Sequence, residues 1–145
     1  MKAISVRQPW AWLLIHGGKN IENRDWYTAY RGALAIHAAQ GMTRAEYEDA
    51  RDFVRSFDPV LAGLIPHPES LVRGYVIGTV MQAGCVKASA SPWFQGKWGH
   101  IYQDARELTI PVLTCGHLGI WEWSVPEEGL RYALQALDSN QEVAT

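Results

Sequence analysis

The longest strand signal in the sequence is the run at residues 74–86, GYVIGTVMQAGCV, which contains two internal glycines. Glycine inside a strand is typical of a bulge or a tight bend, because it has no side chain to pack. A strand that curves around a closed or partly closed barrel needs such bends. The run therefore predicts one long, bent barrel strand, with Gly78 and Gly84 at the bends.

Further strands are expected on both sides of this run. Short segments in which apolar and polar residues alternate, or which are apolar throughout, are typical of strands in a small sheet. They occur at residues 4–6, 21–26, 32–38, 101–104, 108–113 and 119–124. About six short strands with interposed helices indicate an α+β fold, built on a small, partly closed mixed β-barrel.

Helices are expected between these strands. Pro9 suits the first position of a helix at residues 10–16, and the glycine pair at 17–18 ends it. A capping box at residues 43–46 (TRAE) predicts a second helix at 44–57, which Asp58-Pro59 stops. A last helix is expected from Pro126 to about residue 137. Residues 60–72 favour no single structure.

The size and composition favour one globular domain. With 145 residues, 48% of them hydrophobic, the chain suits one domain at residues 1–138 and a frayed tail at 139–145. The longest apolar run covers residues 10–15, whereas a bilayer needs about 20 residues, so no membrane association is expected. Cys85 and Cys115 form no CxxC pair and suggest free thiols. A cytoplasmic location is therefore expected.

The charge is distributed unevenly along the chain. The net charge is −2, but residues 1–40 carry +3 and residues 73–110 carry +2, while the predicted helical segments are acidic. A local basic cleft on a weakly acidic protein can still attract phosphate. The scarcity of basic residues argues against a long nucleic-acid footprint and favours a small ligand or a few nucleotides.

One short stretch, residues 5–37, gathers most of the side chains that could bind a ligand. Arg7, Gln8 and Trp10 lie where the first strand turns into the first helix, so a guanidinium, an amide and an indole meet at one strand end. Each could contact a substrate, because a base stacks on an indole while a guanidinium holds phosphate.

The next strand adds a second group of charges. Glu22, Arg24 and Trp26 share one strand face, because side chains alternate, and Lys19 precedes them after the glycine pair. These four side chains can converge with Arg7 on one cleft. The simpler alternative is a solvated strand that carries surface charges.

The sequence resembles the ASCH domain family, which has a PUA-like β-barrel fold. The resemblance is carried by Arg7-Gln8-Pro9-Trp10, by Gly18-Lys19-x-x-Glu22-x-Arg24, by the strand ending Ala35-Ile36-His37-Ala38 and by the segment 111–121, and it covers nearly the whole chain. It implies action on RNA or nucleosides. Three functions are open: a metal-independent hydrolase such as a ribonuclease on single-stranded RNA, an amidohydrolase on N4-acylated cytidine, and a non-catalytic module that binds single-stranded nucleic acid or a modified base.

Their close spacing makes Lys19, Glu22 and Arg24 the candidate catalytic residues, and the resemblance adds to this for Lys19. Small amidohydrolase members use a lysine, a threonine and a glutamate; Lys19 matches the lysine, but Glu22 stands where the threonine is expected. A lysine of ordinary pKa is a poor base at neutral pH, so Lys19 is better suited to binding a phosphate or an oxyanion. Glu22 could act as a general base if its pKa were raised.

Four further residues are candidates for substrate binding. Arg31 could contact phosphate or be a plain surface charge, and His37 could face the cleft or be a core histidine. In the loop 89–100, Trp93 and Lys97 could form a wall that closes on a base, or the aromatic residues could plug the barrel end. The histidines and cysteines lack metal-ligand spacing, and GxGxxG and P-loop motifs are absent, so neither a metal nor a cofactor is expected.

Overall fold

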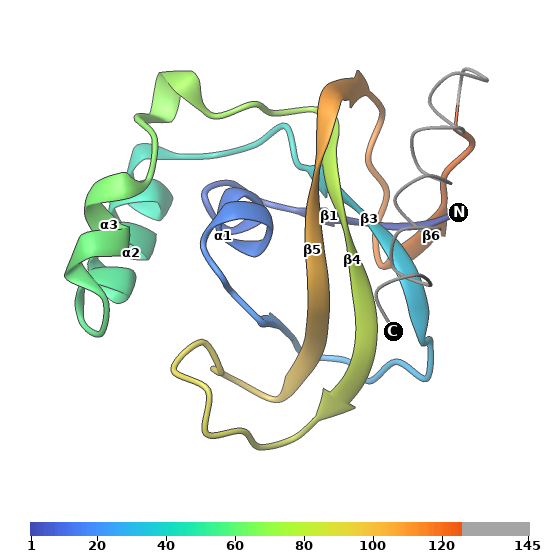
Figure 1. The fold of residues 1–145 in the computed structure, drawn as a ribbon, viewed down its shortest axis with the longest axis horizontal. Helices are drawn as coiled ribbons and strands as arrows, with labels where there is room; N and C mark the ends of the chain where they lie inside the picture. The colour runs from blue at the N-terminus through green and yellow to red at the C-terminus, as the bar shows by residue number, and fades with distance from the viewer. Residues whose placement is uncertain (126–145) are drawn as a thin grey trace.

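Six strands form one strongly curled sheet, a half-barrel, in the part of the chain that the structure describes, residues 1–125 (Figure 1). The structure is a computed structural model. The strands are β1 (Lys2–Val6), β2 (Ile21–Arg24), β3 (Gly32–Ala38), β4 (Tyr75–Val86), β5 (Trp98–Leu113) and β6 (Ile120–Glu122). The helices are α1 (Trp10–His16), α2 (Arg44–Arg55) and α3 (Pro59–Leu64), with a 3₁₀ turn, η1 (Pro68–Ser70). The predicted α+β barrel fold of about six strands is thus confirmed.

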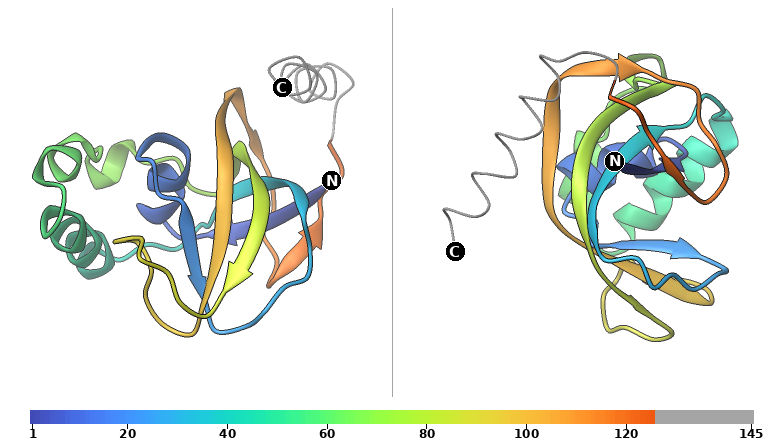
Figure 2. Two further views of the ribbon diagram at one scale, coloured as in Figure 1. Left: turned by 60° about the horizontal axis from the view of Figure 1, so that its bottom comes forward. Right: turned by 90° about the vertical axis from the view of Figure 1, so that its right-hand side faces the viewer.

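The sheet order is β2-β5-β4-β3-β1-β6, and its strands are antiparallel except for the parallel pair β1–β3. The two long strands β4 and β5 bend with the curl of the sheet (Figure 2). Their pairing register shifts between Val76 and Gly78 and again between Gln82 and Gly84. Both predicted glycine bends therefore coincide with irregularities of the ladder. A Cβ atom at Gly78 would lie 2.5 Å from the carbonyl oxygen of Arg106, so this position requires glycine.

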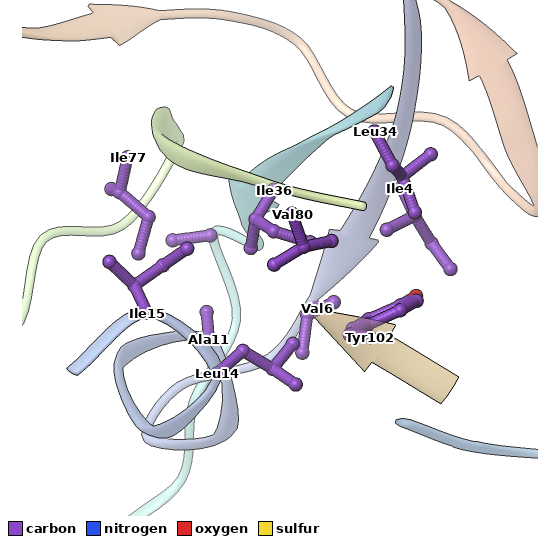
Figure 3. Close-up of a cluster of buried hydrophobic side chains, with 11 residues drawn as sticks. Ile4, Val6, Ala11, Leu14, Ile15, Leu34, Ile36, Ile77, Val80 and Tyr102 are labelled. Carbon is purple, nitrogen blue, oxygen red and sulfur yellow. The ribbon is translucent and has the colours of Figure 1, made fainter. Parts of the chain in front are cut away.

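Helix α1 lies between the sheet on one side and the pair α2 and α3 on the other (Figure 1). Its apolar residues therefore serve two cores. Leu14 and Ile15 pack with strand residues such as Ile36 (Figure 3), whereas Leu13 packs with the α2 residue Val54. This explains why α1, WAWLLIH, is apolar almost all round rather than on one stripe.

Several predicted boundaries were wrong. The two strands expected at 101–104 and 108–113 are one continuous strand, β5, which already begins at Trp98 inside the predicted loop. Strand β2 ends at Arg24, two residues early. The Asp58-Pro59 pair follows α2, which ends at Arg55, and also opens α3, because the Asp58 side chain accepts a hydrogen bond from the Leu61 amide at 3.0 Å.

Two predictions concern the C-terminal residues. The helix expected at 126–137 and the tail expected at 139–145 lie outside the described residues. None of the helices within residues 1–125 combines the length and apolar character that crossing a bilayer would require.

Candidate functional site

Lys19, Glu22 and Arg24 form one buried network of ion pairs. Lys19 Nζ lies 3.1 Å from Glu22 Oε1 and also donates to the carbonyl oxygen of Ile21. The other carboxylate oxygen, Glu22 Oε2, accepts from Arg24 Nε at 3.0 Å and from Arg24 Nη2 at 2.9 Å. The side chains of Lys19 and Glu22 are only 2% and 9% exposed. The predicted convergence of these three charges is therefore present.

The local backbone explains this arrangement. After α1, Gly18 adopts a positive φ of 70°, and the amide of Lys19 donates to the carbonyl of Leu13 at 3.1 Å. This turn starts β2 directly beneath the helix. Along β2 the side chains alternate, so Glu22 and Arg24 share one face, while Ile21 is buried in the core.

Burial and charge act in opposite directions on the two partners. For Lys19, burial is the largest influence and lowers the pKa of the ammonium, although the Glu22 carboxylate partly offsets it. For Glu22, burial alone would raise the pKa, but the Lys19 and Arg24 cations together outweigh it and hold the pKa below its usual value. The condition for Glu22 to serve as a general base, a raised pKa, is therefore not met.

The network lines one wall of a cleft of about 570 Å³. The indole of Trp10 lies in the same cleft, and Lys19 Nζ is 5.5 Å from its ring centroid, within range of a cation–π contact. An ammonium, a carboxylate and a guanidinium thus share a concave site with an indole. The complete lining is Ser5, Val6, Arg7, Trp10, Lys19, Glu22, Asn23, Arg24, Ala39, Gln95, His117, Leu118 and Gly119.

Arg7 lines the cleft but already has a partner. Its Nε and Nη2 atoms donate to the two carboxylate oxygens of Glu46, on α2, at 2.6 and 2.7 Å. The guanidinium also lies against Gly41, where a Cβ atom would come within 2.7 Å of Arg7 Nη1. Arg7 is about half exposed, so its ion pair is solvated and can exchange for a ligand anion.

Three other sequence candidates lie elsewhere. The buried side chain of Gln8 donates to the carbonyl of Val72 at 2.9 Å and accepts from the amide of Trp12, so its amide group fixes the chain rather than lining the cleft. Because β2 ends early, Trp26 does not continue the face of Arg24 and instead stacks edge-to-face on the buried His100. The Arg31 guanidinium bonds to the carbonyls of residues 28 and 30, at the surface.

The remaining candidates also lie outside the cleft. Trp93 is buried and packs against Phe53 and Phe57 in the core cluster that the helices share, so its indole is not exposed to the cleft. Lys97 is exposed in the same loop and does not line the cleft. His37 is 2% exposed and lines a neighbouring cavity.

Some lining residues escaped the sequence analysis. Asn23 holds the loop 91–96 over the cleft: its Nδ2 donates to the carbonyl of Trp93, and its Oδ1 accepts from the amide of Gln95, both at 2.8 Å. Strand alternation places the Asn23 side chain on the other face from Glu22 and Arg24, so its sequence position gave no signal. His117 and Leu118 come from a segment with no local pattern, and only the fold brings them to the cleft.

The part of the chain covered by residues 1–125 holds no cluster of three or more His, Cys, Asp or Glu side chains arranged for a metal ion. The cleft instead offers fixed hydrogen-bond donors and an indole. Such a set can hold an anion, a carbonyl oxygen or an aromatic ring.

The chain is similar to one protein-family model and to known proteins over much of its length. A protein-family model described as the ASCH domain matches residues 4–108. Mouse activating signal cointegrator 1 is 30% identical over 130 residues, which cover 82% of this chain and 22% of that protein. Human activating signal cointegrator 1 is 57% identical over 83 residues, which cover 57% of this chain and 14% of that protein. The chain thus spans less than a quarter of the length of these relatives.

Proposed function

Because this chain belongs to the ASCH domain family, whose members generally bind RNA, we propose that its cleft binds one nucleotide of a single-stranded RNA. The observation that carries the proposal is the Lys19–Glu22–Arg24 network beside Trp10. Two cations are held by one carboxylate, so the buried site keeps an excess of positive charge. A phosphate could lie beside the Lys19–Glu22–Arg24 network while the base of the same nucleotide stacks on the indole of Trp10.

The scale of the cleft supports a nucleotide rather than a duplex. A volume of about 570 Å³ falls in the range of small-molecule sites. The chain as a whole is weakly acidic, so contacts with many phosphates are not supported. We therefore expect modest, salt-sensitive affinity for short single strands.

The state of Glu22 supports binding over hydrolysis as the first proposal. Both of its oxygens accept hydrogen bonds from cations, and its pKa is held down, so it is a poor proton acceptor. A metal-independent hydrolase remains the second candidate, acting on single-stranded RNA or on N4-acylated cytidine. One observation favours it: burial lowers the pKa of the Lys19 ammonium, which brings a neutral amine closer to physiological pH.

The binding proposal is tested by titrating labelled RNA pentamers, single- and double-stranded, at two salt concentrations. Arg24→Gln removes one cation of the network and should weaken single-strand binding roughly 10- to 100-fold, the range for a charge-assisted hydrogen bond. Arg55→Gln, an exposed change on α2, is the control for lost charge. Unchanged affinity in a folded Arg24→Gln protein would overturn the proposal.

The hydrolase candidate is tested separately. The protein is incubated with single-stranded RNA and with N4-acetylcytidine, with and without a chelator, beside a Lys19→Met variant whose fold is checked by circular dichroism. Turnover that survives the chelator and disappears in the variant would support hydrolysis. Binding without turnover would leave the binding module.

A further inference from the structure

A second cavity, of about 860 Å³, adjoins the cleft. The two share four lining residues, Ser5, Ala39, His117 and Leu118, so the same side chains form the border between them. The rest of the second lining comes from the end of β3 and the residues after it, from the residue before β4, and from the end of β5 and the segment that follows: His37, Gln40, Gly74, Leu113, Thr114, Cys115 and Gly116.

The two compartments differ in charge. The cleft contains Arg7, Lys19, Glu22 and Arg24, whereas the lining that residues 1–125 give the second cavity includes no Asp, Glu, Lys or Arg. Instead, two leucines on its walls are exposed, Leu113 at 74% and Leu118 at 99%. Large apolar side chains that are exposed around one concavity are typical of a binding surface.

The polar groups at the border are held in a defined state. His37 Nε2 lies 2.7 Å from the carbonyl oxygen of Thr114, which only accepts, so Nε2 carries the proton. Burial lowers the pKa of His37, which keeps the ring neutral, and Nδ1 then accepts from the Ser5 hydroxyl at 3.0 Å. The Ser5 oxygen keeps a free lone pair at the junction of the two compartments.

We propose that this second cavity receives the base of the neighbouring nucleotide, so that the site binds a dinucleotide unit of a single strand. The inference rests on the function proposed above and specifies its ligand. The cleft takes the charged portion and the first base, and the uncharged cavity takes the second base, with the shared wall of Ser5 and Leu118 between them.

A nucleobase fits this cavity better than an acyl chain. The cavity continues from the charged cleft, so its ligand must carry an anionic part next to an uncharged part, as two linked nucleotides do. Its walls also carry the exposed Gln40 carboxamide, whose hydrogen bonds to water an acyl chain would displace without replacing them. The Thr114 hydroxyl donates to the carbonyl of Val112 at 2.9 Å and can still accept a hydrogen bond from a ligand. The polar edges and apolar faces of a base match both kinds of wall.

The test compares three ligands at one salt concentration: a mononucleotide, a dinucleotide, and the dinucleotide with one abasic position, made in both orientations. A seated second base should strengthen binding by about 5- to 100-fold over the mononucleotide, as expected from the stacking of one base. The abasic form should lose that gain in one orientation. Equal affinity for all three ligands would overturn the inference while leaving the proposed function intact.

Two leucine variants give a matched control. Leu113→Ser lies in the second cavity and should reduce the ratio of dinucleotide to mononucleotide affinity about 3- to 10-fold, because one apolar wall is lost. Leu64→Ser changes a comparably exposed leucine on α3 and should leave that ratio unchanged. If no ligand binds, the proposed function fails and this inference fails with it. If the ratio of dinucleotide to mononucleotide affinity were the same in both variants, the second cavity would not be part of the binding site.

Discussion

Replacing Glu22 by Gln is the sharpest test of the buried charge network. The substitution keeps the size of the side chain but turns one of the two acceptor oxygens into an NH₂ donor. That donor must then face either the Lys19 ammonium or the Arg24 guanidinium, both of which also only donate. The side chain of Lys19 is 2% exposed, so water cannot replace the lost carboxylate.

The magnitude follows from this burial. Breaking a buried ion pair by removing one partner costs about 3–5 kcal/mol, because the other charge stays buried without compensation. The exposed i,i+4 pair Arg44–Glu48, with side chains 84% and 48% exposed, gives the contrast. There Glu48→Gln should cost no more than about 0.5 kcal/mol.

Equilibrium urea unfolding at pH 7, followed by tryptophan fluorescence, measures both losses. The double variant Lys19→Met/Glu22→Gln should be more stable than the sum of the single losses predicts, by about 1–3 kcal/mol, since it leaves no buried ammonium. A loss below about 1 kcal/mol for Glu22→Gln, or simple additivity in the double variant, would refute the reasoning.

Four further predictions concern single positions. Trp93→Ala should lower the free energy of unfolding, measured in urea, by about 3–5 kcal/mol, because the indole is buried in the core. An unchanged urea midpoint with lost RNA affinity would instead indicate that the indole stacks on a base. Gly116→Val should lower the free energy of unfolding by about 1–3 kcal/mol, since its Cβ would lie 2.7 Å from His37 Cε1 and from Ser5 Oγ. The loss should appear as a lower melting temperature. Stability should fall as the pH drops below about 6.5, because burial lowers the pKa of His37 and the unfolded chain then binds more protons; urea midpoints at pH 5 and 7.5 should differ less in His37→Asn. Glu46→Gln should release Arg7 into the cleft, and titration at several salt concentrations should show tighter RNA binding with a steeper salt dependence.

Features set by local sequence were predictable. The glycine pair after α1 ends that helix, and the period-two alternation of β2 places Glu22 and Arg24 together, so the centre of the site followed from residues close in sequence. The prediction that Trp26 continues this face was wrong, because β2 ends at Arg24. The bend after Arg24 has no glycine or proline to announce it, and the partner of Trp26, His100, lies 74 residues away.

Features set by distant pairing were not predictable. Gln8 reads as a ligand-binding amide, yet its partner is the carbonyl of Val72, 64 residues away. The second cavity depends on the pairing of β4 with β5, which brings the Thr114 amide to the carbonyl of Gly74 at 3.0 Å. No local pattern in residues 113–118 predicts that Thr114 lies next to Gly74. The single-domain assignment to residues 1–138 and the cytoplasmic location stay predictions.

The contact between Arg24 and Ser5 joins two strands that the sheet itself keeps apart. Among the strands of residues 1–125, β2 lies at one edge and pairs with β5 alone, while β1 lies four places further along. The bond from Arg24 Nη2 to the Ser5 carbonyl, at 2.8 Å, therefore crosses the open side of the half-barrel. Arg24, a cation of the proposed binding site, thus also helps to close the half-barrel. A substitution at Arg24 should therefore weaken this contact between β1 and β2 as well as any ligand binding, whereas a substitution at Arg7, on the rim of the cleft, should leave the contact intact.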